Sequence, residues 1–141
     1  DAALVYDSGN DFERITGEIY GEDFNNDNTE NDGDSRSDNK GPEPEAIAYG
    51  EVDGRAFAFI GLERMGGLFV YEIDDVSVPR YVAYINNRDL DADPQAGMAG
   101  DLGPESIVFI AAADSPLAGV PLLVVGNEIS GSTTVYRLGM E

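Results

Sequence analysis

Residues 56–67 read AFAFIGLERMGG, and they align without a gap on residues 121–132, which read PLLVVGNEISGS. The two windows share a Gly, a Glu and a second Gly at the same places. A Val-Tyr pair follows each window, and a third such pair lies near the start of the chain. The three tyrosines, Tyr6, Tyr71 and Tyr136, are each 65 residues apart. A fixed period of this length indicates tandem repeats of one structural unit.

Each repeat is expected to consist of four short β-strands, because its apolar runs are brief, rich in β-branched and aromatic residues, and separated by Gly, Pro and Asp. In the complete repeat, residues 44–86, we expect strands near 45–50, 56–61, 67–73 and 79–86. Four-stranded antiparallel units in tandem are typical of β-propeller blades. The sequence therefore predicts an all-β fold, a fragment of a propeller with just over two blades.

The rest of the chain is divided by the same repeat. We expect the last two strands of one blade within residues 1–20, near 3–7 and 12–20, and the first three strands of the next blade within 104–141. A propeller closes with about four blades or more. We therefore expect either an excerpt of a longer chain, whose remaining blades complete the ring, or a homo-oligomer, and we favour the excerpt.

Charge and composition exclude several classes of function. Against 28 Asp and Glu there are only 8 Lys and Arg, so the formal net charge is −20, which disfavours nucleic acid as a partner. The chain has neither Cys nor His, which excludes Ser-His-Asp and Cys-His nucleophiles and thiolate or histidine zinc sites. No apolar run is long enough to cross a bilayer, so we expect no direct membrane insertion. The acidity suits either divalent cations or a high-salt habitat.

Four glutamates are expected on one face of the repeat. Glu45 and Glu105 begin first strands, and Glu63 and Glu128 end second strands. In an antiparallel blade these two positions lie on the same side. Like charges brought together there favour a bound cation. The alternative is that the carboxylates only accept hydrogen bonds from turn amides.

Two long acidic loops are expected at the same side. Loop 21–43 and loop 87–103 are rich in Asp and Asn, whose oxygens are typical ligands of calcium, although neither loop follows the EF-hand pattern. The alternative for both is a solvated acidic insertion. The candidate calcium ligands are Asp23, Asn25, Asp27, Asp32, Asp34 and Asp38 in the first loop and Asp89, Asp91 and Asp101 in the second.

Arg64 is the best candidate for binding an anionic ligand, because it follows Glu63 in the turn expected on the acidic face. An exposed salt bridge is the alternative for this arginine. The sequence identifies no catalytic residues, since no pair of carboxylates is singled out for acid–base work.

Four segments together resemble the bacterial choice-of-anchor I family: residues 40–47 (KGPEPEAI), 59–67 (FIGLERMGG), 99–105 (AGDLGPE) and 126–131 (GNEISG). The resemblance covers nearly the whole chain. It implies the C-terminal part of a secreted, periplasmic or cell-surface propeller, related to mesenchyme-specific cell-surface glycoproteins and sometimes labelled alkaline phosphatase. Two functions are therefore expected: a calcium-binding extracellular module for binding or scaffolding, or part of a calcium-dependent phosphoesterase completed by further blades. The Pro-Glu strand starts are similar in kind to those of propeller phosphatases and phytases that hold calcium.

Overall fold

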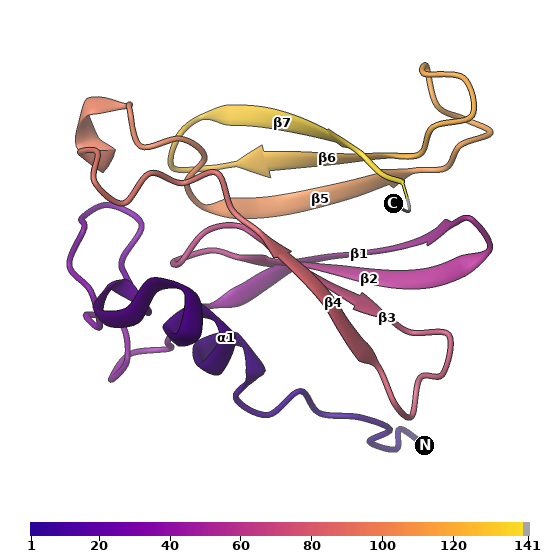
Figure 1. Cartoon of the computed structure of the whole chain (residues 1–141), viewed down its shortest axis with the longest axis horizontal. Helices are drawn as coiled ribbons and strands as arrows, with labels where there is room; N and C mark the ends of the chain where they lie inside the picture. The colour runs from indigo at the N-terminus through magenta and orange to yellow at the C-terminus, as the bar shows by residue number, and fades with distance from the viewer. Residues whose placement is uncertain (140–141) are drawn as a thin grey trace.

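The computed structural model describes residues 1–139 and contains two antiparallel β-sheets and one short α-helix. The first sheet has four strands in the order β1-β2-β3-β4, and the second has three in the order β5-β6-β7, so each strand pairs with its neighbour in the chain (Figure 1). The mostly β fold is confirmed, and the last two positions of the predicted segment 104–141 lie outside the described residues. The strands are β1 (Pro44–Val52), β2 (Arg55–Leu62), β3 (Leu68–Glu72), β4 (Arg80–Ile85), β5 (Pro104–Ile110), β6 (Leu122–Asn127) and β7 (Ser132–Arg137).

The two sheets share one pairing register, as the 65-residue alignment predicts. Gly61 of β2 pairs with Leu68 of β3, and Gly126 of β6 pairs with Thr133 of β7. The strands β1 to β4 coincide with the four predicted for residues 44–86 to within two residues at each end. The sequence alignment and the hydrogen-bond ladders therefore describe the same repeat.

The sheets pack face to face through an apolar core. Phe57 and Phe59 of β2 meet Leu123 and Val125 of β6 in one buried cluster. The ring of Phe109 in β5 stacks on that of Phe59, with the ring centroids 6.1 Å apart. Figure 1 shows the second sheet lying along one face of the first.

A glycine in β1 allows this close approach of the sheets. A Cβ atom on Gly50 would lie 2.3 Å from a ring carbon of Phe109, which is closer than real carbon atoms approach. Gly50 is therefore required for packing, since its backbone does not have a positive φ.

The opposite face of the first sheet is covered by a helix, α1 (Asp11–Tyr20), which continues into a 3-10 turn, η1 (Gly21–Asp23). Ile15 of α1 is buried against Phe69 and Tyr71 of β3 in a second apolar cluster. The ring of Phe12 meets that of Phe69 edge to face at 4.8 Å between centroids. The prediction of a strand at 12–20 is therefore wrong.

Residues 11–20 form a helix rather than the predicted strand because of the spacing of their apolar residues. Ile15 and Thr16 lie three and four positions after Phe12, and Tyr20 lies four positions after Thr16, which is the period of one helical face rather than the alternation of a strand. The hydroxyl of Thr16 donates to the carbonyl of Phe12 at 2.7 Å, as a residue on the buried side of a helix can do.

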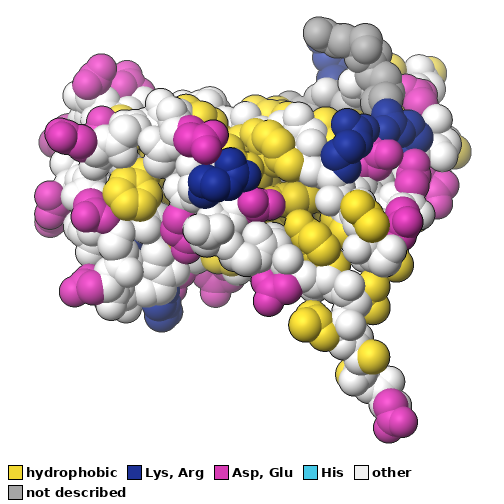
Figure 2. Space-filling view, turned by 60° about the horizontal axis from the view of Figure 1, so that its bottom comes forward, with side chains coloured by type: hydrophobic (Ala, Val, Ile, Leu, Met, Phe, Trp, Pro, Cys, Tyr) yellow, Lys and Arg dark blue, Asp and Glu magenta, His cyan; other side chains and the backbone are white. Residues whose placement is uncertain are grey.

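The strand predicted at residues 3–7 is also wrong, because this segment has no strand pairing within the described chain. Its residues instead border a hollow of about 410 Å³ over the outer face of the first sheet, lined by Tyr6, Phe12, Ile60 and Tyr71 among others. In Figure 2 hydrophobic side chains gather near the middle of the molecule and along the protruding end of the chain, while acidic side chains are spread over the rest of the face.

The two acidic segments lie at the same end of the sheets, where β2 and β6 end (Figure 1). The segment 24–43 contains no helix or strand, and the segment 87–103 contains only a 3-10 turn, η2 (Pro94–Ala96). The opposite end carries the short hairpin turn Asp53-Gly54, whose φ angles of 51° and 78° are those of the tight turn that this pair favours. No helix among residues 1–139 combines the length and the apolar character that crossing a membrane requires.

Replacing glycine by alanine at two positions is expected to have opposite effects on stability. Gly50→Ala forces a methyl group against the Phe109 ring and should lower the free energy of unfolding by about 1–3 kcal/mol. Gly17→Ala adds a methyl group inside α1, where its nearest neighbour is the Phe24 ring at 3.7 Å, and should raise it by about 0.5–1 kcal/mol. Urea unfolding measures both values, and a stabilised Gly50 variant or a destabilised Gly17 variant would contradict the packing described.

Candidate functional site

A β-bulge begins the first strand of each sheet. In both the β1·β2 and the β5·β6 ladder the register shifts near the start, so Glu45 and Glu105 have no partner on the neighbouring strand. A bulge redirects the side chain of the extra residue. Both glutamates are exposed, whereas the next residue of β1, Ala46, is buried.

The turns after β2 and β6 are attached to the segments before β1 and β5 in the same way. The amide of Glu63 donates to the carbonyl of Glu43 at 2.8 Å, and the amide of Glu128 donates to the carbonyl of Gly103 at 2.8 Å. These bonds place Glu63 and Glu128 beside the bulges. The structure therefore brings the four predicted glutamates to one end of the sheets, which we call the glutamate edge (Glu45, Glu63, Glu105 and Glu128).

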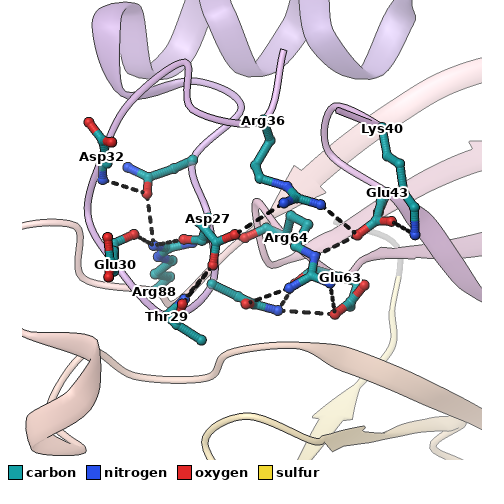
Figure 3. A network of polar contacts seen from close by, with 12 residues as sticks. Asp27, Thr29, Glu30, Asp32, Arg36, Lys40, Glu43, Glu63, Arg64 and Arg88 are labelled. Carbon is teal, nitrogen blue, oxygen red and sulfur yellow. Dashed lines mark hydrogen bonds and ion pairs between the residues drawn. The ribbon is translucent and has the colours of Figure 1, made fainter. Parts of the chain in front are cut away.

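Glu43 was not predicted as a site residue, although it is central to the contacts here. It has a φ of 51°, and the equivalent residue of the second sheet is Gly103, with a φ of 71°. A left-handed conformation is costly for a residue other than glycine and recurs at functional positions. The Glu43 carboxylate is paired with Lys40 at 2.6 Å and with Arg64 at 2.5 Å (Figure 3).

Glu43 and Glu63 form a coupled pair of buried carboxyl groups. Burial, together with hydrogen bonding to Glu43 and Glu45, raises the pKa of Glu63 to about 7, although the charge of Arg64 opposes this. Burial acts to raise the pKa of Glu43 as well, but the bonds to Lys40, Arg64 and Glu63 hold it at about 2. At pH 7 Glu43 is therefore ionised, and Glu63 carries a proton about half of the time.

The electrostatic interaction extends from one sheet to the other. The negative charges of Glu128 and Glu45 raise the pKa of Glu105. Glu45 also interacts with Glu63. The glutamate edge is therefore a connected set of like charges, in which the carboxylates of both repeats repel one another.

Arg64, predicted to bind an anionic ligand, is engaged by the protein itself. Its Nη1 donates to Oδ1 of Asn28 at 2.9 Å, and its Nη2 lies 3.3 Å from Oε1 of Glu63. With Nε bonded to Glu43 as well, all three guanidinium nitrogens have partners. A phosphate would have to displace one of these contacts.

The acidic loop 21–43 is folded around buried amides. Asn26 and Asn28 are fully buried and Asn25 is 3% exposed. The Nδ2 of Asn25 donates to Ser37 at 3.0 Å, and the carboxylate of Asp27 accepts from the amide of Thr29 at 2.9 Å. The loop is therefore neither a solvated insertion nor one open shell of oxygens.

The other predicted ligands of this loop point to separate partners or to solvent. Asp34 accepts a hydrogen bond from Ser37, and the main chain of Asp32 donates to Oδ1 of Asn26 at 3.1 Å. The side chains of Asp23 and Asp38 belong to exposed residues. The structure thus does not bring these carboxylates together around one point.

The predicted ligands in loop 87–103 are likewise used locally. The carboxylate of Asp89 accepts from the amide of Asp91 at 2.9 Å. Asp101 accepts from Ser132 at 2.6 Å and from Asn87 at 2.8 Å. Burial acts to raise the pKa of Asp101, but hydrogen bonds from Ser132, Thr134 and Asn87 lower it. The bonds from Ser132 and Thr134 attach this loop to β7.

Across the part of the chain that the structure describes, no three His, Cys, Asp or Glu side chains are grouped as a metal ion would require. The donors at the glutamate edge suit calcium by their chemistry, since they are carboxylate oxygens held close enough to repel one another. The calcium predicted in loop 21–43 does not find such a group of carboxylates, because Asp27 and Asp34 accept hydrogen bonds from Thr29 and Ser37 while Asp23 and Asp38 lie at exposed positions.

Sequence reasoning missed Glu43, Asn26 and Asn28, and it treated Arg88 as a phosphate ligand or an exposed salt-bridge partner rather than as a buried residue that holds the loop. Only Glu43 carried a usable signal: the repeat alignment puts Pro42-Glu43-Pro44-Glu45 opposite Leu102-Gly103-Pro104-Glu105, so a glutamate replaces a turn glycine. Arg88 offered no comparable signal, because its partners are 23 to 62 residues away in the chain.

Replacing Glu63 by Gln is expected to remove a pH dependence of stability. Since the folded protein raises the pKa of Glu63 from 4.5 to about 7, its stabilising contribution is complete below pH 4.5 and is lost as the pH rises through 7. The loss is at most about 3 kcal/mol. Glu63→Gln keeps a donor toward Glu43 and Glu45 at every pH, so the variant should be more stable than the wild type at pH 8 and similar to it at pH 4.

Urea unfolding from pH 4 to 8 measures this effect, with Glu30→Gln, an exposed glutamate of the neighbouring loop 21–43, as the control. If the wild type and the Glu63 variant kept parallel pH profiles, the shared proton would be ruled out.

Comparison with known proteins relates the chain to a cell-surface protein and to one domain family. The chain is 29% identical to gigasin-3a of Magallana gigas over 145 aligned residues, which cover 95% of this chain and 51% of the relative. It is 34% identical over 64 residues to the mesenchyme-specific cell surface glycoprotein of Strongylocentrotus purpuratus, covering 45% of this chain and 8% of that protein. The chain thus spans about half of the first relative and far less of the second, and no solved structure matches it significantly. A family model, the choice-of-anchor I domain, matches residues 1–76, more than half of the chain, and the chain therefore belongs to the choice-of-anchor I domain family.

Proposed function

We propose that this chain is a surface-associated module made of neighbouring β-propeller blades, and that its glutamate edge binds a divalent cation, calcium first of all. The observation that carries the proposal is the repeated bulge, which places glutamates of two successive repeats in electrostatic contact. One calcium ion would remove the repulsion between several of these carboxylates at once.

Three features of the fold support a propeller. Each sheet is an antiparallel meander, the two sheets share their register and their bulge, and the strands β1 and β5 lie beside each other. In a propeller, the first strands of successive blades lie next to each other around the central channel. The glutamate edge would then lie at the mouth of that channel, where further blades would add equivalent residues.

The residues that would hold calcium are Glu45, Glu105 and Glu128. All three are exposed, so their side chains can turn toward a common ion without unfolding any strand. Glu63 differs, because it is buried and bonded to Asn28 and Arg64, and it would act by fixing the position of Glu45. Hard cations of this kind take oxygen ligands, and these three side chains supply carboxylate oxygens.

The surface location rests on the relatives. One of them is named as a cell surface glycoprotein, and the family name refers to anchored proteins. An exterior location would expose the module to abundant calcium, so even weak carboxylate sites would be occupied there. We therefore propose a binding or scaffolding role in which the ion holds adjacent blades together.

Calcium is expected to raise the melting temperature of the wild type in proportion to the logarithm of free ion, because it binds the folded state alone. The double variant Glu45→Gln with Glu105→Gln should lose this response. The control is Asp53→Asn with Asp114→Asn, which removes the same charge from the opposite end of the sheets. The measurement is a thermal melt at constant ionic strength, with calcium varied against sodium.

Two results would refute the proposal. One is a wild type whose melting temperature responds to calcium no more than to sodium. In that case the acidic composition would reflect only a high-salt habitat, in which salt screens the charges. The other is a double variant at the edge that keeps the full calcium response, which would place the ion elsewhere.

A further inference from the structure

Arg88 is a buried cation held by neutral oxygens. It is 7% exposed and lies between the acidic loop 21–43 and the turn that follows β2. Its Nη1 donates to the carbonyl of Arg64 at 2.9 Å, and its Nη2 donates to the carbonyl of Asp27 at 2.6 Å and to Oδ1 of Asn31 at 3.0 Å. Longer contacts reach the carbonyls of Met65 and Glu30 and the amide oxygen of Asn26.

None of these six oxygens belongs to a carboxylate. Four are main-chain carbonyls, and the other two are asparagine side-chain oxygens. A cage of six such oxygens is what a hard cation of the calcium type requires in number and chemistry. In this protein the planar guanidinium occupies the cage, and its N–H groups donate to all six oxygens, of which those of Asn26 and Met65 also accept from the Asp32 amide and from Asn86.

The position of the cage explains why the loop is ordered although it is strongly acidic. Arg88 lies against Asp27 and Glu30 of the loop (Figure 3) and connects them to the carbonyls of Arg64 and Met65 in the turn of the first sheet. The loop therefore closes onto the sheet through one side chain contributed from more than 50 residues further along the chain.

We propose that Arg88 is a built-in cation that takes the structural place of a metal ion in loop 21–43, and that the oxygens around it form a latent site for a small external cation, guanidinium in particular. The loop then folds without calcium. This inference does not depend on calcium at the glutamate edge, which involves different residues.

The first test removes the side chain and supplies its head group. Arg88→Ala should melt many degrees below the wild type, because it removes the donor that six oxygens share and leaves several of them without a hydrogen bond. Guanidinium chloride in the tens of millimolar should raise the melting temperature of this variant by several degrees, whereas the same concentration of urea or sodium chloride should not. The control is Arg80→Ala, which removes an exposed arginine paired with Glu72 on β4 and should show neither the large loss nor the rescue.

A variant that melts like the Arg80 control, or that responds equally to guanidinium and urea, would overturn the proposal. Where Arg88→Ala does not fold, two further measurements decide. Asn31→Ala, which removes one oxygen bonded to Arg88 together with the amide that donates to Leu90 and Ala92, should weaken the loop and leave the sheets intact. In the wild type, the amides of Asp34 and Arg36, bonded to Phe24 and Asn25 within the loop, should keep their protection from hydrogen exchange in excess EDTA. Loss of that protection on chelation would show that a metal ion, and not Arg88, organises the loop.

Discussion

The arrangement of this molecule depends on a hydrogen-bond register that shifts at the same place in both sheets. Successive side chains of a strand point to opposite faces, so a shift by one residue decides which of them faces the core. Here it leaves Glu45 and Glu105 at the surface while Ala46 packs inside. Small residues then let the sheets meet, since a Cβ on Gly61 would be 3.2 Å from the Cβ atoms of both Ala46 and Pro104. The carboxylates of two repeats meet because their backbones can approach this closely.

Acidic side chains brought together in this way need compensation, and the chain supplies part of it internally. Four of its eight basic residues, Arg36, Lys40, Arg64 and Arg88, lie in or against loop 21–43. The proton shared by Glu43 and Glu63 reduces the charge further. The other residues of the glutamate edge, Glu45, Glu105 and Glu128, have no basic partner among the contacts of the described residues. The proposed calcium binding is confined to them for this reason.

The repeat was predictable from sequence because register and apolar pattern are local properties: the alignment of residues 56–67 on 121–132 anticipated β2, β3, β6 and β7 and the convergence of the glutamates. The helix α1 was not predicted because the 65-residue repeat favours a strand at this place, although the three-to-four spacing of its apolar residues is that of a helix. The order of loop 21–43 was not predictable, since Asn26 and Asn28 are buried only where Arg88 and Arg64 reach them from distant positions. Such contacts leave no periodic trace in a single sequence.

The most direct test of the central claim, that both repeats contribute to one set of interacting carboxylates, is an NMR titration of the glutamate carboxyl carbons in the wild type and in Glu45→Gln. We expect Glu63 to titrate near pH 7 and Glu43 near pH 2, and Glu105 to titrate above its ordinary range. In Glu45→Gln the titration of Glu105 should move back toward that range, because one of the two repelling charges has gone. Independent titration of all these glutamates at ordinary values, unchanged by the substitution, would contradict the account.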